Sequence, residues 1–94
     1  MKKITQFLNE EGKIKQIPSK NAKKILVYEY LIQKFDYDQD YSEKAVNLII
    51  TSWHTFGDCV LLRRGLVENG FLCRLPDGSN YWRNKEKDRI ENEY

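Results

Sequence analysis

Residues 58–83 read DCVLLRRGLVENGFLCRLPDGSNYWR, and this stretch decides the fold. Asp58 is a good helix N-cap and Gly70 is a typical left-handed stop, so a helix is predicted from Asp58 to Asn69. β-prone residues flank the turn Pro76-Asp77-Gly78, in which proline presets φ, aspartate bonds locally and glycine accepts a positive φ. The stretch therefore predicts a helix followed directly by a β-hairpin.

Two more helices are predicted upstream of this stretch. The first covers roughly 20–35 with Ser19 as its N-cap, and its apolar residues are spread too widely for a surface helix, which indicates a central core helix. Ser42 caps the second, in which four apolar residues at helical spacing form one core face: Val46, Ile49, Ile50 and Trp53. A short turn over 54–57 joins this helix to the next, which is the helix-turn-helix pattern.

Helix, helix, helix and hairpin in this order predict an α+β fold of the winged helix-turn-helix type. We expect a single domain over residues 1–83 and a charged C-terminal tail over 84–94. Before the first helix, Ile4–Leu8 suits a helical turn or an arm, and the alternation in Lys13–Ile17 suits a short strand. Tyr41 is placed in a very short strand.

Size and composition fit one small globular domain. A chain of 94 residues has room for one modest core. No apolar run approaches the ~20 residues of a membrane span, and the first residues lack the apolar stretch of a signal peptide, so we expect a cytoplasmic protein without membrane contact.

Few side chains in this sequence are of the cysteine or histidine type that binds transition metals. Cys59, Cys73 and the single His54 are too few and too dispersed for a typical metal site, so no metal is expected and the cysteines are interpreted as small core residues. His54 at a helix end is explained by the helix dipole and solvent contact. A redox-sensing Cys59 near a helix N-terminus is the alternative.

Charge is unevenly distributed along the chain. The net charge is +2, but residues 1–34 carry eight Lys against three Glu, whereas residues 35–58 carry one Lys against five acidic residues. Such a chain can present a basic face while staying near neutral overall.

The third helix supplies the first candidates for nucleic-acid contact. A helical projection places Arg64 on the outward face with Leu61, Gly65 and Glu68. Arg63 lies near the core edge, where groove contact and a structural ion pair are both open. The exposed Leu61 suits a protein partner as well.

Basic residues elsewhere fit phosphate contacts better than base reading. They lie on the hairpin and at the start of the first helix: Arg74, Arg83, Lys20, Lys23 and Lys24. Tyr81 and Trp82 are interpreted as hairpin packing and not as base-stacking residues.

The expected function is non-enzymatic binding of nucleic acid, namely double-stranded DNA, by a transcriptional regulator. No Gly-rich phosphate loop, no nucleophile paired with a base and no apolar-flanked carboxylate pair is present, so no catalytic residue and no cofactor are expected. The alternative is a protein-interaction or dimerisation module of the same fold, since a fold alone does not choose between these roles.

The segments FLNEEGKIKQIPSKNAKKILVYEYLIQKF, YSEKAVN, LLRRGLVENGFLCR and PDGSNYWR resemble the bacterial domain of unknown function 2087 family from Phe7 to Arg83. The matching motif positions are Pro18, Lys20, Leu62, Arg63, Arg64, Leu66, Gly70, Asp77, Gly78, Tyr81 and Trp82. The resemblance implies a stand-alone protein or a C-terminal part of a regulator, with a nucleic-acid-binding role and no catalytic residues. In the family pattern an acidic residue follows the paired arginines. This chain departs from that pattern, because it has Gly65 at this position.

Overall fold

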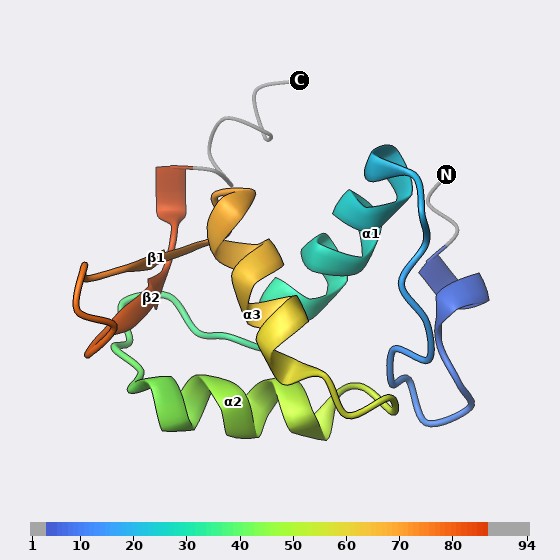
Figure 1. Cartoon of the computed structure of the whole chain (residues 1–94), viewed down its shortest axis with the longest axis horizontal. Helices are drawn as coiled ribbons and strands as arrows, with labels where there is room; N and C mark the ends of the chain where they lie inside the picture. Colours follow the sequence, from blue (N-terminus) through green and yellow to red (C-terminus); the bar gives the residue numbers. More distant parts are fainter. Residues whose placement is uncertain (1–3, 87–94) are drawn as a thin grey trace.

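The computed structural model describes residues 4–86 and shows an α+β winged-helix layout (Figure 1). A 3₁₀-helix precedes three α-helices, and an antiparallel hairpin of two strands follows them. The elements are η1 (Ile4–Phe7), α1 (Asn21–Ile32), α2 (Glu43–Ser52), α3 (Cys59–Glu68), β1 (Leu72–Arg74) and β2 (Tyr81–Arg83). The predicted fold class is therefore confirmed.

Helix α1 is shorter than predicted and begins without a side-chain cap. Its N-cap position is Lys20, which makes no side-chain capping bond, so the prediction of Ser19 as the N-cap is wrong. The helix ends at Ile32, and the last predicted residues form a turn in which the Phe35 N–H donates to the Ile32 carbonyl at 3.0 Å. The C-terminal half of α1 is buried at Val27, Tyr28, Leu31 and Ile32, as expected of a core helix, whereas its first turn is exposed.

The predicted strand over 13–17 is not formed, because only Ile14 pairs. Ile14 is fully buried and makes isolated bridges to Leu8 and to His54. Its N–H donates to the Trp53 carbonyl at 2.8 Å, and its carbonyl accepts from Thr55 N–H at 3.0 Å. The N-terminal segment thus anchors the turn between α2 and α3.

Local signals set both ends of the helix-turn-helix. The Ser42 hydroxyl accepts from the Ala45 N–H at 3.0 Å, and the Asp58 carboxylate accepts from the Leu61 N–H at 3.1 Å. Gly70, just after α3, has φ 81°, a conformation that glycine adopts without strain. These predicted caps and this predicted stop are confirmed.

His54, in the turn, is buried, so the expected solvent contact is wrong. The residue is 6% exposed. Nδ1 of its ring lies 2.7 Å from the Ile50 carbonyl oxygen, and Nε2 accepts from the Asp58 N–H at 2.9 Å. Because a carbonyl only accepts, Nδ1 is the donor to Ile50 in this network, and Nε2 is the acceptor. His54 therefore joins the end of α2 to the start of α3.

The hairpin is closed by its turn and tied to the connector between α1 and α2. The Asp77 carboxylate accepts from Ser79 N–H at 2.9 Å and from its hydroxyl at 2.7 Å, and these bonds lower the pKa of Asp77. Tyr41 pairs with Tyr81, each N–H donating to the other's carbonyl at 2.8 Å. Tyr41 thus pairs where a very short strand was predicted, but as an isolated bridge and not as a strand.

The core lies where the three helices meet the hairpin. Its largest fully buried side chains come from every part of the fold: Ile14, Leu31, Ile32, Phe35, Ile50, Leu62, Leu66, Phe71, Leu72 and Tyr81. Cys59 and Cys73 are free and half-buried; Cys59 packs against this core, and burial raises the pKa of Cys73.

Asn84, directly after β2, is bonded to the turn between α3 and β1. Asn84 donates from its backbone N–H to the Phe71 carbonyl at 3.0 Å and from its amide to the Gly70 carbonyl at 2.7 Å. The remainder of the predicted tail, from 87 on, lies outside the described residues. Within residues 4–86, no helix has the length and apolarity needed to cross a membrane.

Candidate nucleic-acid interface

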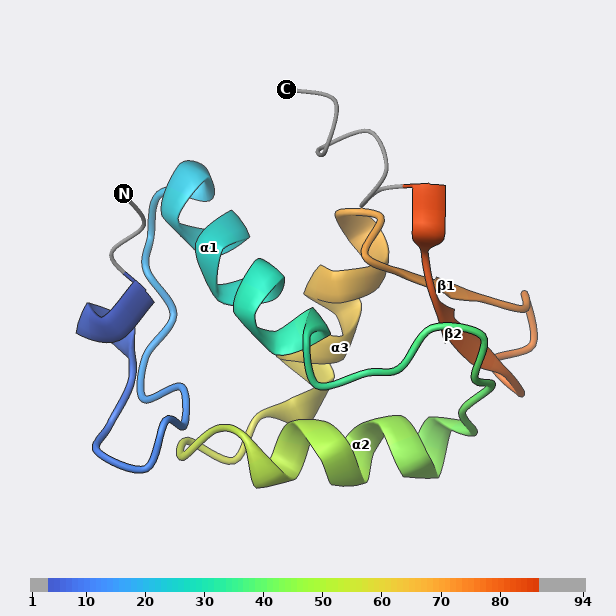
Figure 2. The same ribbon diagram turned by 180° about the vertical axis from the view of Figure 1, so that it is seen from behind.

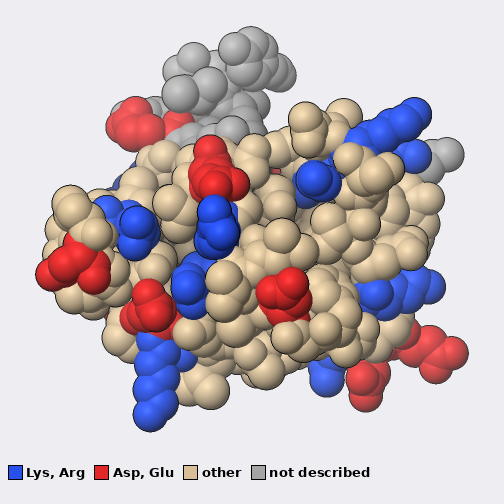
Figure 3. All heavy atoms as spheres, in the orientation of Figure 1, with Lys and Arg blue, Asp and Glu red and all other residues tan. Residues whose placement is uncertain are grey.

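Helix α3 lies on one broad face of the molecule, and the acidic connector between α1 and α2 lies on the other. The connector passes behind α3 in Figure 1 and in front of it in Figure 2. The space-filling view of the α3 face shows lysine and arginine interspersed with acidic residues (Figure 3). This face is therefore mixed in charge, but the acidic connector does not cover it.

Arg64 projects from α3 into solvent, as predicted. Its nearest charged partner is Glu68, one turn along the helix, with 3.9 Å between Nη2 and Oε2. Both side chains are more than two-thirds exposed, so this pair is worth only a few tenths of a kcal/mol. Arg64 can therefore exchange Glu68 for another anion at little cost.

Arg63 has a structural partner, although not the ion pair that was one of its two predicted roles. Its Nη1 donates to the Asn47 amide oxygen at 2.5 Å, which joins α3 to α2. The side chain is half-buried, and it still reaches the surface beside Arg64.

One hollow collects three of the predicted arginines, and we call it the arginine groove. It lies between α3 and the hairpin and has a volume of about 360 Å³. Its lining residues are Glu43, Arg63, Arg64, Val67, Glu68, Arg74 and Tyr81. Arg74 is exposed at the end of β1, opposite Tyr81 in the register. Three cations and two carboxylates leave the groove with an excess of one positive charge.

The lysines of α1 are only partly associated with this surface. Lys24 lines a neighbouring hollow between α1 and α3 together with Arg64, and we call it the helix groove. Its other lining residues are Tyr28, Asp58, Val60, Leu61, Gly65 and Glu68. Lys20 and Lys23 are exposed at the start of α1 but line neither groove.

Arg83 is buried, which corrects the expectation of an exposed arginine on the wing. The residue is 7% exposed, and its Nη1 donates to the Phe35 carbonyl at 3.1 Å. The guanidinium also lies over the Tyr37 ring, 4.1 Å from the centroid. Burial lowers the pKa of Arg83, and Asp36 partly opposes that effect. Its role is to hold the hairpin to the connector.

Gly65 does not lie on the outward face, contrary to the helical projection. It is buried against α1, and a Cβ at this position would lie 2.2 Å from the Tyr28 hydroxyl oxygen. The buried side of α3 therefore includes this position as well as Leu62 and Leu66. Leu61 is exposed, as predicted.

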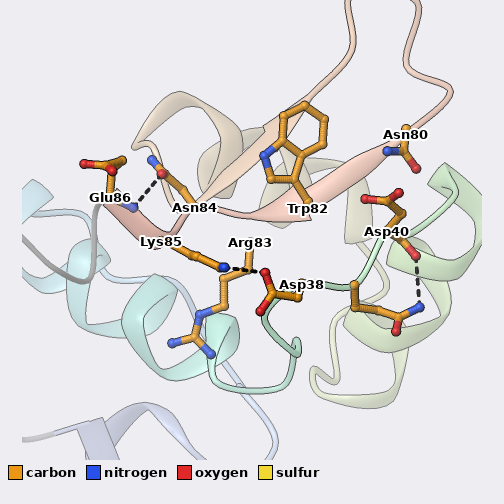
Figure 4. Close-up of a pocket in the computed structure, with 9 residues that line it drawn as sticks. Asp38, Asp40, Asn80, Trp82, Arg83, Asn84, Lys85 and Glu86 are labelled. Atoms are coloured by element: carbon orange, nitrogen blue, oxygen red, sulfur yellow. Dashed lines mark hydrogen bonds and ion pairs between the residues drawn. The ribbon is translucent and has the colours of Figure 1, made fainter.

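A third hollow lies on the connector side of the hairpin and differs in chemistry (Figure 4). Trp82 and Arg83 point to opposite sides of β2, as successive strand residues do. Carboxylates and amides dominate its lining, which comprises Asp38, Gln39, Asp40, Asn80, Trp82, Arg83, Asn84, Lys85 and Glu86. Lys85 is paired with Asp38. This hollow offers a phosphate no free cation among its described residues.

A comparison with protein families gives one match. The family described as "Uncharacterized protein conserved in bacteria (DUF2087)" matches residues 13–83, which is more than half of the chain. The chain belongs to this family. The resemblance noted in the sequence is thereby confirmed. Neither a curated protein nor a solved structure matches this DUF2087 chain.

The sequence did not predict two residues of the candidate interface in this DUF2087 domain. Asn47, the partner of Arg63, lies on another helix, so no local pattern could indicate it. Val60 is 47% exposed beside Leu61. The helical projection already places Val60 away from Leu62 and Leu66, so its exposure could have been predicted.

Proposed function

We propose that this chain binds double-stranded DNA, with α3 in the major groove and the hairpin beside the phosphate backbone. The observation that carries the proposal is the arginine groove, where Arg63 and Arg64 of α3 meet Arg74 of the hairpin. In a helix-turn-helix, the second helix of the motif enters the major groove, and α3 holds that place here. Because these arginines lie on a helix and on the adjacent hairpin, they can contact phosphates in two stretches of one DNA backbone.

Phosphate contacts supply most of the affinity in this proposal. Arg64 and Arg74 are exposed, and Lys24 extends the cationic surface toward α1. Glu43 and Glu68 line the same groove and oppose an anion. Binding is therefore weak and falls steeply with salt, because neutralised phosphates release their counterions.

Fluorescence anisotropy with a mixed-sequence duplex tests the proposal. We expect affinity to fall steeply between about 50 and about 200 mM salt. Arg64→Ala should weaken binding and reduce the magnitude of the logarithmic salt slope by about one, the change expected for one lost phosphate contact. Lys15→Ala is the matched control, because Lys15 is exposed and lines neither groove.

Glu68→Gln tests the opposing charge in the same assay. Removing this carboxylate frees Arg64 and takes one negative charge from the groove, so duplex binding should tighten severalfold at low salt. Wild-type protein that binds no duplex at about 50 micromolar, a range in which even non-specific binding is measurable, would refute the proposal.

A second candidate function is a protein-interaction or dimerisation module. The observation that favours it is three exposed aliphatic side chains on the helix-turn-helix: Leu48 at 62%, Val60 at 47% and Leu61 at 46%. Sedimentation velocity tests this candidate. A mass that rises with protein concentration, together with no response to duplex DNA, would favour it over DNA binding.

A further inference from the structure

Two aliphatic side chains occupy the exposed side of the first turn of α3. Val60 and Leu61 follow Cys59 directly, and each keeps nearly half of its surface in solvent. The start of the helix is fixed, because the Asp58 carboxylate caps the Leu61 N–H and the His54 ring holds the Asp58 N–H. The two side chains therefore have a defined position.

Their surroundings are charged and not apolar. Val60 and Leu61 line the helix groove together with Arg64 from the next turn and Lys24 from α1. Of the two acidic residues in that groove, Asp58 is engaged at the helix cap and Glu68 is paired with Arg64. An aliphatic pair that shares a groove with two cations fits a ligand that has an apolar group beside an anionic backbone.

The major groove of DNA has such a group in the C5-methyl of thymine, which packs against apolar side chains. Residues at the N-terminus of a recognition helix meet base edges. Valine and leucine side chains have no hydrogen-bonding groups, so they discriminate between bases by contact with this methyl. We propose that Val60 and Leu61 read thymine methyl groups in the major groove and give this domain a preference for thymine-containing sites. The inference rests on the proposed DNA binding and adds selectivity to it.

The test compares duplexes that differ only in methyl groups. One mixed-sequence duplex carries interspersed thymines, and the other carries deoxyuridine at every such position, which keeps the charge and the base-pairing groups. We expect the wild-type protein to bind the thymine duplex about fourfold more tightly for each contacted methyl, the effect of burying one such group. A further pair of duplexes carries cytosine or 5-methylcytosine at these positions. The protein should bind the duplex with 5-methylcytosine more tightly.

The variants assign the preference to the two residues. Val60→Ala/Leu61→Ala should bind the thymine and deoxyuridine duplexes equally and keep the wild-type salt slope. Leu48→Ala is the matched control, because it shortens an exposed aliphatic side chain on α2 outside the helix groove and should keep the full preference. Arg64→Ala should weaken binding to both duplexes by the same factor. Thermal unfolding followed by circular dichroism verifies that each variant is folded.

The outcomes separate this inference from the proposed function. Salt-sensitive binding with equal affinity for the two duplexes would overturn the methyl-reading role and leave DNA binding standing. A thymine preference that persists in the double variant would overturn it too, because duplex shape would then be the cause. Failure to bind any duplex would overturn both.

Discussion

Gly65 sets how closely α1 and α3 approach each other. An added Cβ would lie 2.2 Å from the Tyr28 hydroxyl oxygen and 2.3 Å from its Cζ, so the ring itself would have to move. Tyr28 is buried, and burial together with the charge of Glu68 raises its pKa. Glycine has a low helix propensity. It is nevertheless required at this position, because a larger residue would collide with the Tyr28 ring.

Gly65→Ala should destabilise the domain despite the better helix propensity of alanine. Overpacking against Tyr28 costs about 1–3 kcal/mol, whereas the propensity gain is at most about 1 kcal/mol. Urea unfolding measures the difference. In Gly65→Ala/Tyr28→Leu the collision is relieved, so the two substitutions should be non-additive. Strict additivity would contradict this account of Gly65.

At the scale of elements, the turn between α2 and α3 depends on a buried ring. His54 accepts from the Asp58 N–H and contacts the Ile50 carbonyl, while Ile14 pairs with the backbone on either side of it. The angle between the two helices thus rests on polar contacts as well as on apolar packing.

His54→Ala should loosen this turn. It leaves the Asp58 N–H and the Ile50 carbonyl without the ring, at a cost of about 1–3 kcal/mol in the free energy of unfolding. The Asp58 amide should also exchange faster with deuterium. Thr55→Ala is the control, because this exposed neighbour keeps its backbone bond to Ile14. An unchanged exchange rate at Asp58 in His54→Ala would contradict the assigned role.

At the scale of the whole molecule, the hairpin and the connector between α1 and α2 form one unit. Tyr41 and Tyr81 share two backbone hydrogen bonds, and Arg83 reaches the Phe35 carbonyl. The Tyr41 hydroxyl in turn accepts from the Asp36 N–H at 2.8 Å. The hairpin is therefore tied to the connector on one side, while Arg74 lines the arginine groove beside α3 on the other.

Arg83→Met separates this structural role from the proposed DNA binding. The methionine keeps apolar bulk but removes the donor to the Phe35 carbonyl, so we expect a loss of about 1–3 kcal/mol in the free energy of unfolding. Duplex affinity of the folded variant should stay the same. Arg74→Met should do the opposite, with little change in stability and weaker binding. Equal losses of affinity in the two variants would contradict this division.

The features that were predicted correctly from the sequence depend on residues that lie close together in the chain. The caps at Ser42 and Asp58 and the Pro-Asp-Gly turn each depend on neighbours within four residues, and all are present. The burial of Arg83 depends on the connector, since its partner Phe35 lies 48 residues earlier in the sequence. No local sequence pattern could have predicted this contact. The position of Ile14 depends on the turn after α2 in the same way.

The contact between Gly65 and Tyr28 has a consequence for the evolution of the family. Two positions that occupy one volume cannot change independently, so a member with a side chain at the position of Gly65 needs a smaller residue at that of Tyr28. A member with an acidic residue at the position of Gly65 should therefore lack the tyrosine. Across the family, the residues at these two positions should covary. The members that combine glycine with tyrosine should form one branch of the family.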